Sequence, residues 1–390
     1  MPKFVRTMCV QVKTLDLRKT MSNETTLNVR IDAKTKEQAA GTLKAIGLTP
    51  STVVRLLMAK IAEEKRVPFE LNLRTSAEDV SAVAKESKFT YIDLFAGIGG
   101  FHCAANALGG KCVFASEIDS EAKKAYEANY GITPYGDITQ VDAQDIPNHD
   151  LLFAGFPCQP FSIIGNRLGF DDIRGTLFFE IARILEKKAP PMFVLENVKQ
   201  LSTHNKGRTL ATILKKLKDL GYKVHWKVLN ALDYGLPQKR ERTLIVGFKN
   251  HSVVFEFPKK QKMKPLKDLL EREEDIDEKH FASEAIVMKR QAKHASLYDI
   301  SIWHENKSGN ISSYPYSCAL RAGASYNYLL VNGVRRLTPR EMLRLQGFPD
   351  EFKIVCNDSQ TRKQAGNAVP VNMIKAVIKE VLNANAKAQT

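Results

Sequence analysis

Asp93-Leu94-Phe95-Ala96-Gly97-Ile98-Gly99-Gly100 is the stretch of sequence that decides the fold class. Residues 91–95 predict a strand, and a helix is expected over about 100–108. Glycines between a strand and a helix let the backbone approach a ligand closely, and the first turn of the helix favours an anionic group. The turn therefore predicts a cofactor site that includes Gly97 and Gly99.

A carboxylate follows the next predicted strand, at 113–116. Glu117 comes 20 residues after Gly97, where a carboxylate can accept hydrogen bonds from both hydroxyls of a ribose. The glycine turn alone is a weak signal, because it fits nicotinamide, flavin and adenosylmethionine cofactors, and a purely structural turn needs the same glycines. Motifs later in the chain decide between these cofactors.

From Phe89 onward, the pattern alternates strands with helices, as an α/β sheet requires. Further strands are predicted at 151–154 and 193–195, with helices at about 176–187 and 208–220. The main domain is assigned to 89–249. Residues 250–333 lose this rhythm and predict an inserted smaller domain, whereas helical signals at 338–345 and 370–385 assign 334–390 to the C-terminal part of the main domain.

The N-terminal region predicts a separate small module. Residues 1–24 form a leader without clear periodicity, and 76–88 a polar linker; the module spans 25–75. Residues 26–31 alternate as a strand does, a helix is expected over 35–46 up to Gly47, and Thr49 with Pro50 starts a second helix that ends near Lys65. A lone strand cannot satisfy its edge, so this order predicts a homodimer in which two such strands pair.

Composition limits the classes of protein. The 390 residues are 44% hydrophobic and 26% charged, and no run of about 18 apolar residues predicts a membrane span. Six cysteines occur singly, without a C-x-x-C pair, so neither a disulfide scaffold nor a zinc site is expected. The net charge of +15 favours a polyanionic partner. We expect a cytoplasmic protein without a metal.

Three motifs that carry chemistry lie at predicted strand ends. Gly155–Ser162 places Cys158 in a loop just past a strand, Glu196 ends another strand, and Arg240 follows a turn at a third strand boundary. Ligands of α/β proteins bind at the carboxyl ends of the strands. We therefore expect a thiol, a carboxyl group and a guanidinium in one crevice.

These groups suit the methylation of a cytosine at C5. That carbon becomes nucleophilic when a thiolate adds at C6, and a proton delivered to N3 lowers the cost of the addition. Cys158 supplies the nucleophile and a protonated Glu196 supplies the proton. Arg240 is a candidate to activate the thiol and to hold the cytosine O2. No residue is nominated as the base that removes the C5 proton.

A base inside a duplex is covered by its neighbours, so it must be extruded at a cost of a few kcal/mol. The glycine-containing segment 163–176 predicts a lid over the flipped nucleotide. The predicted DNA contacts in and beside this region are Ser162, Asn166, Arg167, Arg174 and, at the third motif, Gln238.

Together with Gln346–Pro349 and Gly366–Pro370, these segments resemble the ordered motif set of the DNA cytosine-5 methyltransferases over roughly 89–249 and 334–385. The resemblance implies a Rossmann-like sheet that uses S-adenosylmethionine, with a target-recognition domain at 250–333. It also implies that Cys158 is the nucleophile, that Glu196 protonates N3, and that Arg240 and Arg242 support the target base and the catalytic loop.

The same resemblance implies a cofactor pocket. Asp137 would meet the adenine amino group, and Ile118 stands where some relatives have an aromatic residue. The predicted pocket comprises Phe95, Gly97, Gly99, Glu117, Ile118, Asp137, Ile138, Pro157, Asn367 and Val369. In the insert, residues 317–323 resemble a threonine-leucine recognition element but have Ala319 at the threonine position, so the bases it reads stay open.

The N-terminal module resembles ribbon-helix-helix antitoxins of the RelB/DinJ type through residues 28–32, 47–51 and 68–71. In that family, paired strands enter the DNA major groove. The resemblance implies that Thr26, Asn28 and Arg30 face base edges; the alternative is that the module only dimerises.

The sequence thus predicts a sequence-specific, prokaryotic DNA cytosine-5 methyltransferase acting on double-stranded DNA. Two alternatives stay open: a DNA-binding transcriptional regulator with a vestigial methylase half, and a tRNA cytosine-5 methyltransferase. Methyl incorporation into duplex DNA and into bulk tRNA would separate the three.

Overall fold

The structure is a computed structural model that describes residues 33–45, 47–64, 87–157 and 177–389. The chain divides into two compact units, Met1–Pro68 and Phe69–Thr390. Each unit is described by itself.

The described residues of the N-terminal unit form two helices, α1 (Ala33–Ala45) and α2 (Pro50–Glu64). Gly47, with a φ of 76°, follows α1, and the Leu48 N–H donates to the Leu43 carbonyl, as at a glycine-terminated helix end. The Thr49 hydroxyl accepts from the Thr52 N–H at 3.2 Å, which confirms the predicted N-cap. The predicted strand at 26–31 lies outside the described residues.

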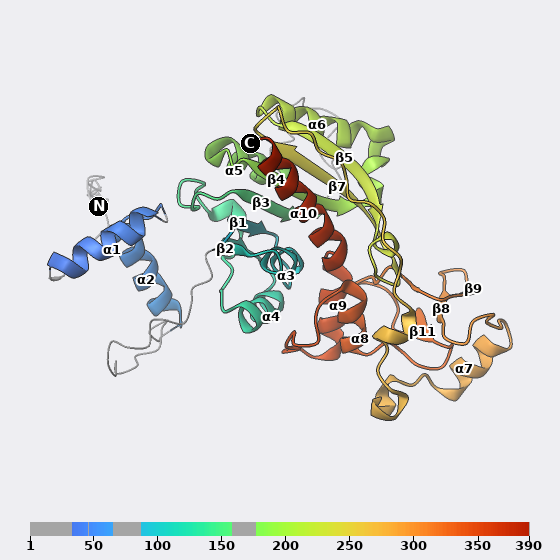
Figure 1. The fold of residues 1–390 in the computed structure, drawn as a ribbon. Coiled ribbons are helices and arrows are strands. Elements are labelled where there is room, and N and C mark those ends of the chain that lie inside the picture. The colour runs from blue at the N-terminus through green and yellow to red at the C-terminus, as the bar shows by residue number, and fades with distance from the viewer. Residues whose placement is uncertain (1–32, 46, 65–86, 158–176, 390) are drawn as a thin grey trace, which may run out of the picture. The chain divides into compact units, whose positions relative to one another are not determined.

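The second unit is built on a six-stranded mixed sheet in the order β2-β1-β3-β4-β7-β5 (Figure 1). The first four strands are mutually parallel, and β7 runs antiparallel to both of its neighbours, β4 and β5. The strands are β1 (Phe89–Leu94), β2 (Gly110–Ser116), β3 (Leu151–Gly155), β4 (Met192–Val198), β5 (Lys223–Asn230) and β7 (Glu241–Phe248). The predicted α/β class is confirmed.

Helices cover both faces of this sheet because the parallel strands are apolar on both sides. Tyr91, Phe153 and Val194 belong to one core with residues of α3 and α10, whereas Ile92 and Leu152 belong to a second core with residues of α5 and α6. The helices are α3 (Gly100–Asn106), α4 (Ser120–Tyr130), α5 (Leu177–Lys188), α6 (Arg208–Asp219) and α10 (Val371–Lys387).

The region 250–333 carries a small antiparallel sheet in the order β11-β8-β9. Val253, Phe255 and Leu266 belong to the same hydrophobic cluster as Tyr91 of the main sheet, so the core is continuous across the two regions. The elements here are α7 (Glu284–Gln291), β8 (Ile302–Glu305), β9 (Ile311–Tyr314), β10 (Ser317–Cys318) and β11 (Leu329–Val331); β10 pairs with β6 (Gln238–Lys239).

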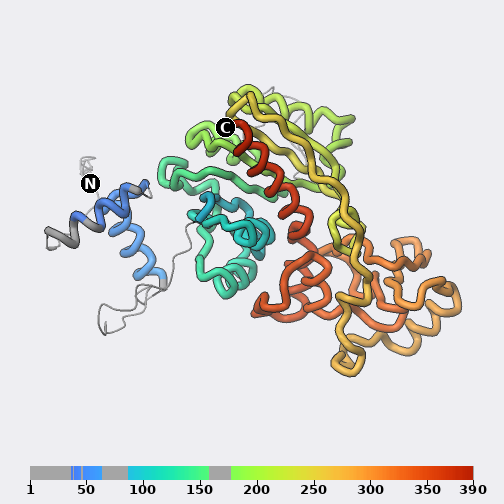
Figure 2. Tube along the Cα trace, viewed as in Figure 1, coloured from blue at the N-terminus to red at the C-terminus, as the bar shows by residue number. Residues whose placement is uncertain are grey.

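The C-terminal segment returns to the start of the main sheet. It comprises α8 (Pro339–Gln346), α9 (Asp358–Asn367) and α10, and α10 packs against α3 (Figure 2). Thr338 and Glu341 form a reciprocal capping box at the start of α8. No helix in the described part of the chain is long and apolar enough to cross a membrane.

Candidate active site

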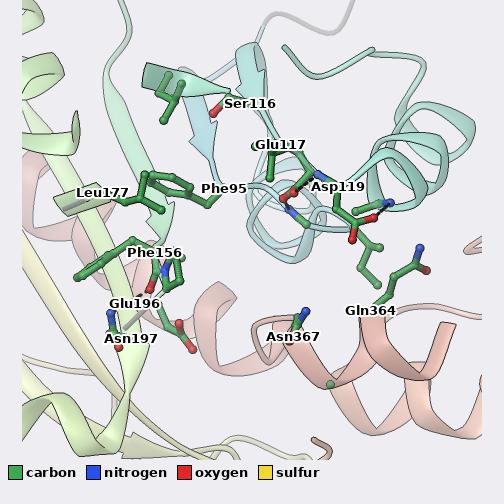
Figure 3. A pocket seen from close by; sticks show the side chains of 18 of the residues that line it. Phe95, Ser116, Glu117, Asp119, Phe156, Leu177, Glu196, Asn197, Gln364 and Asn367 are labelled. Atoms are coloured by element: carbon green, nitrogen blue, oxygen red, sulfur yellow. Dashed lines mark hydrogen bonds between the residues drawn. The ribbon is translucent and has the colours of Figure 1, made fainter. Parts of the chain in front are cut away.

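A cavity of about 420 Å³ opens at the carboxyl ends of β1 to β4, where α/β proteins bind their ligands. Glu196 lines it from the β4 side and Glu117 from the β2 side, and Asn367 at the end of α9 adds a third side (Figure 3). The cavity brings together most of the predicted cofactor and catalytic residues, namely Phe95, Gly97, Glu117, Ile118, Asp137, Ile138, Pro157, Glu196, Arg240, Arg242 and Asn367.

The glycine turn is held by Glu117. The Gly97 N–H donates to Glu117 Oε2 at 2.7 Å, and the Asp119 N–H donates to Oε1 at 2.8 Å. Each carboxylate oxygen keeps further acceptor capacity, because an ionised carboxylate accepts about four hydrogen bonds. Glu117 can therefore accept hydroxyl groups of a ligand while it keeps the turn in place.

Gly99 and Val369, both predicted to contact the cofactor, do not line the cavity. Gly99 has a φ of 81°, and a Cβ there would come 2.2 Å from the Tyr130 ring; a Cβ at Gly100 would come 2.6 Å from Val369 Cγ2. These residues lie in the packing behind the turn, where glycine is needed for close approach.

The part of the cavity predicted to hold the adenine is more exposed to solvent than the glycine turn. Ile118 is 75% exposed at the edge of the cavity. Asp137 Oδ1 accepts from the Thr139 N–H at 2.9 Å, which fixes the carboxylate at the start of a short 3-10 helix. The buried Ser116 hydroxyl also lines the cavity and has no hydrogen-bond partner among the described residues. Polar atoms of this kind fit a nucleoside ligand.

Glu196 is the buried acid of the site. Its Oε1 lies 2.7 Å from Arg242 Nε, and both side chains are nearly buried. Burial raises the pKa of Glu196 above its ordinary value, although the neighbouring Arg242 and Arg240 oppose the rise. Burial thus makes the protonated form easier to reach than in an exposed glutamate, and Arg242 orients the carboxyl group.

Arg240 was predicted to activate the thiol and to hold the cytosine O2; it lines the cavity, and those roles stay predictions. Its guanidinium donates to the carbonyls of Leu320 at 2.9 Å, Gly366 at 2.9 Å and Ala368 at 2.8 Å. Only its Nε lacks a partner in the part of the chain that the structure describes. Arg240 therefore joins the residue before β7 to the chain after β10 and to the end of α9, and Arg242 is the arginine that contacts Glu196.

Gln238 was predicted to contact DNA, but its side chain is fully buried. Its Nε2 donates to the Leu345 carbonyl at 2.8 Å, and its Oε1 accepts from the Leu320 N–H at 3.1 Å. In this structure the Gln238 side chain is committed to these two backbone groups, and its predicted DNA contact stays a prediction.

Sequence reasoning missed several residues at the cavity. Asn197 Nδ2 donates to the Phe156 carbonyl at 2.9 Å and so holds the chain that leads to Pro157. Asp119, Lys363 and Gln364 also line the cavity. Asp119 could have been found as a helix N-cap, because its Oδ1 caps α4. Lys363 and Gln364 belong to α9, which is too polar to show helical periodicity in the sequence.

Several predicted residues lie outside the described residues. They are Cys158, Ser162, Asn166, Arg167 and Arg174, and in the N-terminal module Thr26, Asn28 and Arg30. Their predicted roles stay predictions. No group of acidic, histidine and cysteine side chains suited to hold a metal occurs among the residues that the structure describes.

Comparison with known proteins identifies the family. The family model of the C-5 cytosine-specific DNA methylases matches residues 89–383. The chain belongs to the C-5 cytosine-specific DNA methylase family. Members of this family use S-adenosylmethionine, and the glycine turn, Glu117 and the Ser116 hydroxyl fit that cofactor. Residues 24–90 match the RelB antitoxin family.

Bacterial members of the methylase family are similar along most of their length. The Type II methyltransferase M.NgoBI of Neisseria gonorrhoeae is 57% identical over 290 residues, 74% of this chain and 91% of that protein. M.HaeII of Haemophilus aegyptius is 54% identical over 300 residues, 76% of this chain and 93% of that protein. Among solved structures, a Spodoptera frugiperda DNMT2 variant covers 75% of this chain and 99% of its own with a TM-score of 0.60 and 21% identity, which shows the shared fold.

Proposed function

We propose that this DNA cytosine-5 methyltransferase modifies a specific sequence in duplex DNA, with Cys158 attacking C6 of a flipped cytosine and Glu196 protonating N3. The observation that carries the proposal is the buried Glu196, with a raised pKa, in the cavity that Pro157 also lines. Glu196 belongs to β4, and Pro157 follows the carboxyl end of the neighbouring strand β3.

Chain connectivity supports the role of Cys158. Cys158 follows Pro157 directly in the sequence. Pro157 lines the cavity, and the hydrogen bond from Asn197 fixes the preceding carbonyl of Phe156. The adjacency of Cys158 in sequence to a residue that lines the cavity supports its proposed role as the nucleophile.

The raised pKa of Glu196 supports its role as the acid. A protonated carboxyl group donates to N3 as the Cys158 thiolate adds to C6, so that charge does not build up on the ring. S-adenosylmethionine, when bound, supplies an electrophilic methyl group for C5. A base then takes the C5 proton, and the C6–sulfur bond breaks to return the thiolate of Cys158.

Residues of the cavity have separate tasks in this proposal. Glu117 accepts the ribose hydroxyls, Asp137 the adenine amino group, and Asn367 closes the side formed by α9. Arg242 keeps the Glu196 carboxyl directed at the base through its 2.7 Å contact. Region 250–333 is the proposed target-recognition part, and the segment 163–176 is the proposed lid.

The proposal is tested with Cys158→Ser. We expect this variant to lose transfer of a tritiated methyl group to duplex DNA and to keep DNA binding. Bisulfite sequencing of DNA from cells that express the wild type gives the target site. Transfer by Cys158→Ser at the wild-type rate would refute the proposed nucleophile, and transfer to bulk tRNA but not to duplex DNA would refute the proposed substrate.

We also propose that the N-terminal module dimerises. None of the described side chains between 37 and 63 is buried, although α2 contains Val54, Leu56 and Met58, each at least 39% exposed. Two helices whose described side chains are all at least partly exposed are marginal alone, and a second copy would cover the apolar face. The match to RelB antitoxins supports a DNA-binding and autoregulatory role.

Truncation tests this second proposal. A variant that begins at Phe89 is expected to be monomeric by light scattering, whereas the full chain is dimeric. The variant is also expected to lose binding to its own promoter. A truncated chain that stays dimeric and binds the promoter as the full chain does would contradict the proposal.

A further inference from the structure

A chain of polar contacts links the glycine turn to α9 at the mouth of the cavity. The Gly97 N–H donates to Glu117 Oε2, and the Asp119 N–H donates to Glu117 Oε1 at 2.8 Å. Asp119 Oδ2 in turn pairs with Lys363 Nζ at 2.7 Å. Lys363 is thus connected through Asp119 to the carboxylate proposed to hold the ribose.

Asp119 is held in one orientation because its two oxygens have different partners. Oδ1 accepts from the N–H groups of Glu121 and Ala122, both at 3.0 Å, and so caps α4. Oδ2 is directed at Lys363, whose contact lowers the pKa of Asp119. The cap therefore presents one carboxylate oxygen to α9 in a fixed direction.

Other contacts join α4 to the segment that contains α9. Gln364 Nε2 donates to the Glu121 carbonyl at 3.0 Å, and Asn129 Nδ2 donates to the Lys353 carbonyl at 3.0 Å. Asp119 and Gln364 lie on the same side of the cavity (Figure 3). Segments far apart in sequence thus form one wall of the cofactor cavity, and the Lys363–Asp119 pair is the charged contact at its mouth.

We propose that Lys363 is a positioning residue for S-adenosylmethionine: its ion pair with Asp119 closes the mouth of the cavity and holds Glu117 in place. The proposal rests on the placement of the cofactor in this cavity. Loss of the pair lets the α9 side of the mouth separate from α4, which weakens cofactor binding and speeds its release. The proposed acid Glu196 belongs to β4, which the Lys363–Asp119 pair does not hold, so the rate of the chemical step is expected to stay largely unchanged.

The experiment compares Lys363→Met with Lys124→Met in the full-length protein. Lys124 also pairs with a carboxylate of α4, Glu121 at 3.2 Å, but it does not line the cavity. Calorimetric titration with S-adenosylhomocysteine measures binding without turnover. For a partly exposed ion pair, we expect Lys363→Met to weaken binding about two- to fivefold and Lys124→Met to leave it unchanged.

Steady-state kinetics give a second readout. Lys363→Met is expected to raise KM for S-adenosylmethionine by the same factor and to keep kcat, and Lys363→Arg is expected to restore both binding and KM. High salt should reduce the difference between wild type and Lys363→Met, because an exposed pair is screened. Unchanged binding by Lys363→Met, or a fall in kcat at unchanged KM, would overturn the role of Lys363.

Glu117→Gln separates this inference from the proposed cavity. If Glu117→Gln weakens S-adenosylhomocysteine binding and Lys363→Met does not, the cavity holds the cofactor and the inference for Lys363 is wrong. If neither substitution changes binding, the cofactor binds elsewhere and both proposals fail. Melting temperatures of the variants, expected within a few degrees of wild type, show that the fold is retained.

Discussion

Replacing Glu196 by glutamine tests the proposed acid. The amide keeps the shape of the side chain and offers an oxygen to Arg242 Nε, which lies 2.7 Å from the carboxylate in the wild type. It has no proton to deliver to N3. General acid catalysis contributes about 10²- to 10⁴-fold, or roughly 3 to 5.5 kcal/mol of transition-state stabilisation. We expect a loss of that size in the methylation rate.

Single-turnover transfer measures this effect. Enzyme in excess over a duplex that carries the target site, with saturating S-adenosylmethionine, reports the chemical step without product release. Glu241→Gln is the matched control. Glu241 begins β7, the strand next to β4, and its carboxylate pairs with Lys199 at 2.8 Å in a partly exposed contact. The control should keep its rate within about twofold. A Glu196→Gln variant within threefold of wild type would refute the reasoning.

The pH dependence follows from the same group. Burial raises the pKa of Glu196 in the folded protein, so the protonated form that can donate to N3 persists to higher pH than for an ordinary carboxyl group. The methylation rate should fall as pH rises through this raised pKa. The group's contribution to stability is present below the ordinary carboxyl pKa and diminishes as pH rises through the folded pKa. Glu196→Gln should remove this limb of the rate profile.

Three further substitutions test the packing around the site. Gly99 has a φ of 81°, and the Cβ of an alanine there would lie 2.2 Å from the Tyr130 ring. Gly99→Ala should therefore lower the free energy of unfolding by about 2 kcal/mol or more in urea titrations, and an unchanged midpoint would contradict this. Burial lowers the pKa of His102 to about 3, so unfolding experiments should show stability falling as pH drops below about 6.5, the unfolded value, and His102→Gln should reduce that slope. Arg240→Lys, which loses contacts to three backbone carbonyls, should cost about 2–4 kcal/mol of stability by thermal unfolding; a melting temperature equal to wild type would argue against the structural role.

Local patterns predicted the parallel half of the sheet and its glycine turn. The strands β1 to β4 are short apolar runs bounded by turn residues, and α2 begins at the predicted cap of Thr49. No strand was assigned at β5, because Lys223, His225 and Lys227 break its apolar pattern and Leu229 is its one buried residue. β7 was anticipated only as a strand boundary beside Arg240. The polar helix α9 was missed for the related reason that its residues show little apolar periodicity.

The roles of Gln238 and Arg240 could not be read from local sequence. A run of polar and charged residues predicts a solvated surface, yet both side chains are fully buried. Gln238 bonds to backbone groups of Leu320 and Leu345, 82 and 107 residues away. Arg240 donates to the carbonyls of Leu320 and Ala368, 80 and 128 residues away, and only the tertiary fold brings these groups close. Burial of such side chains depends on distant loops that supply carbonyl groups.

Trapping the covalent intermediate tests the central claim most directly. A duplex with 5-fluorocytosine at the target site should stop the reaction after Cys158 has added to C6, because fluorine cannot leave as the C5 proton does. In the presence of S-adenosylmethionine, we predict a complex that survives denaturing electrophoresis, with the modified nucleotide on the peptide that contains Cys158. The absence of a stable complex, or an adduct on any other cysteine, would contradict the account.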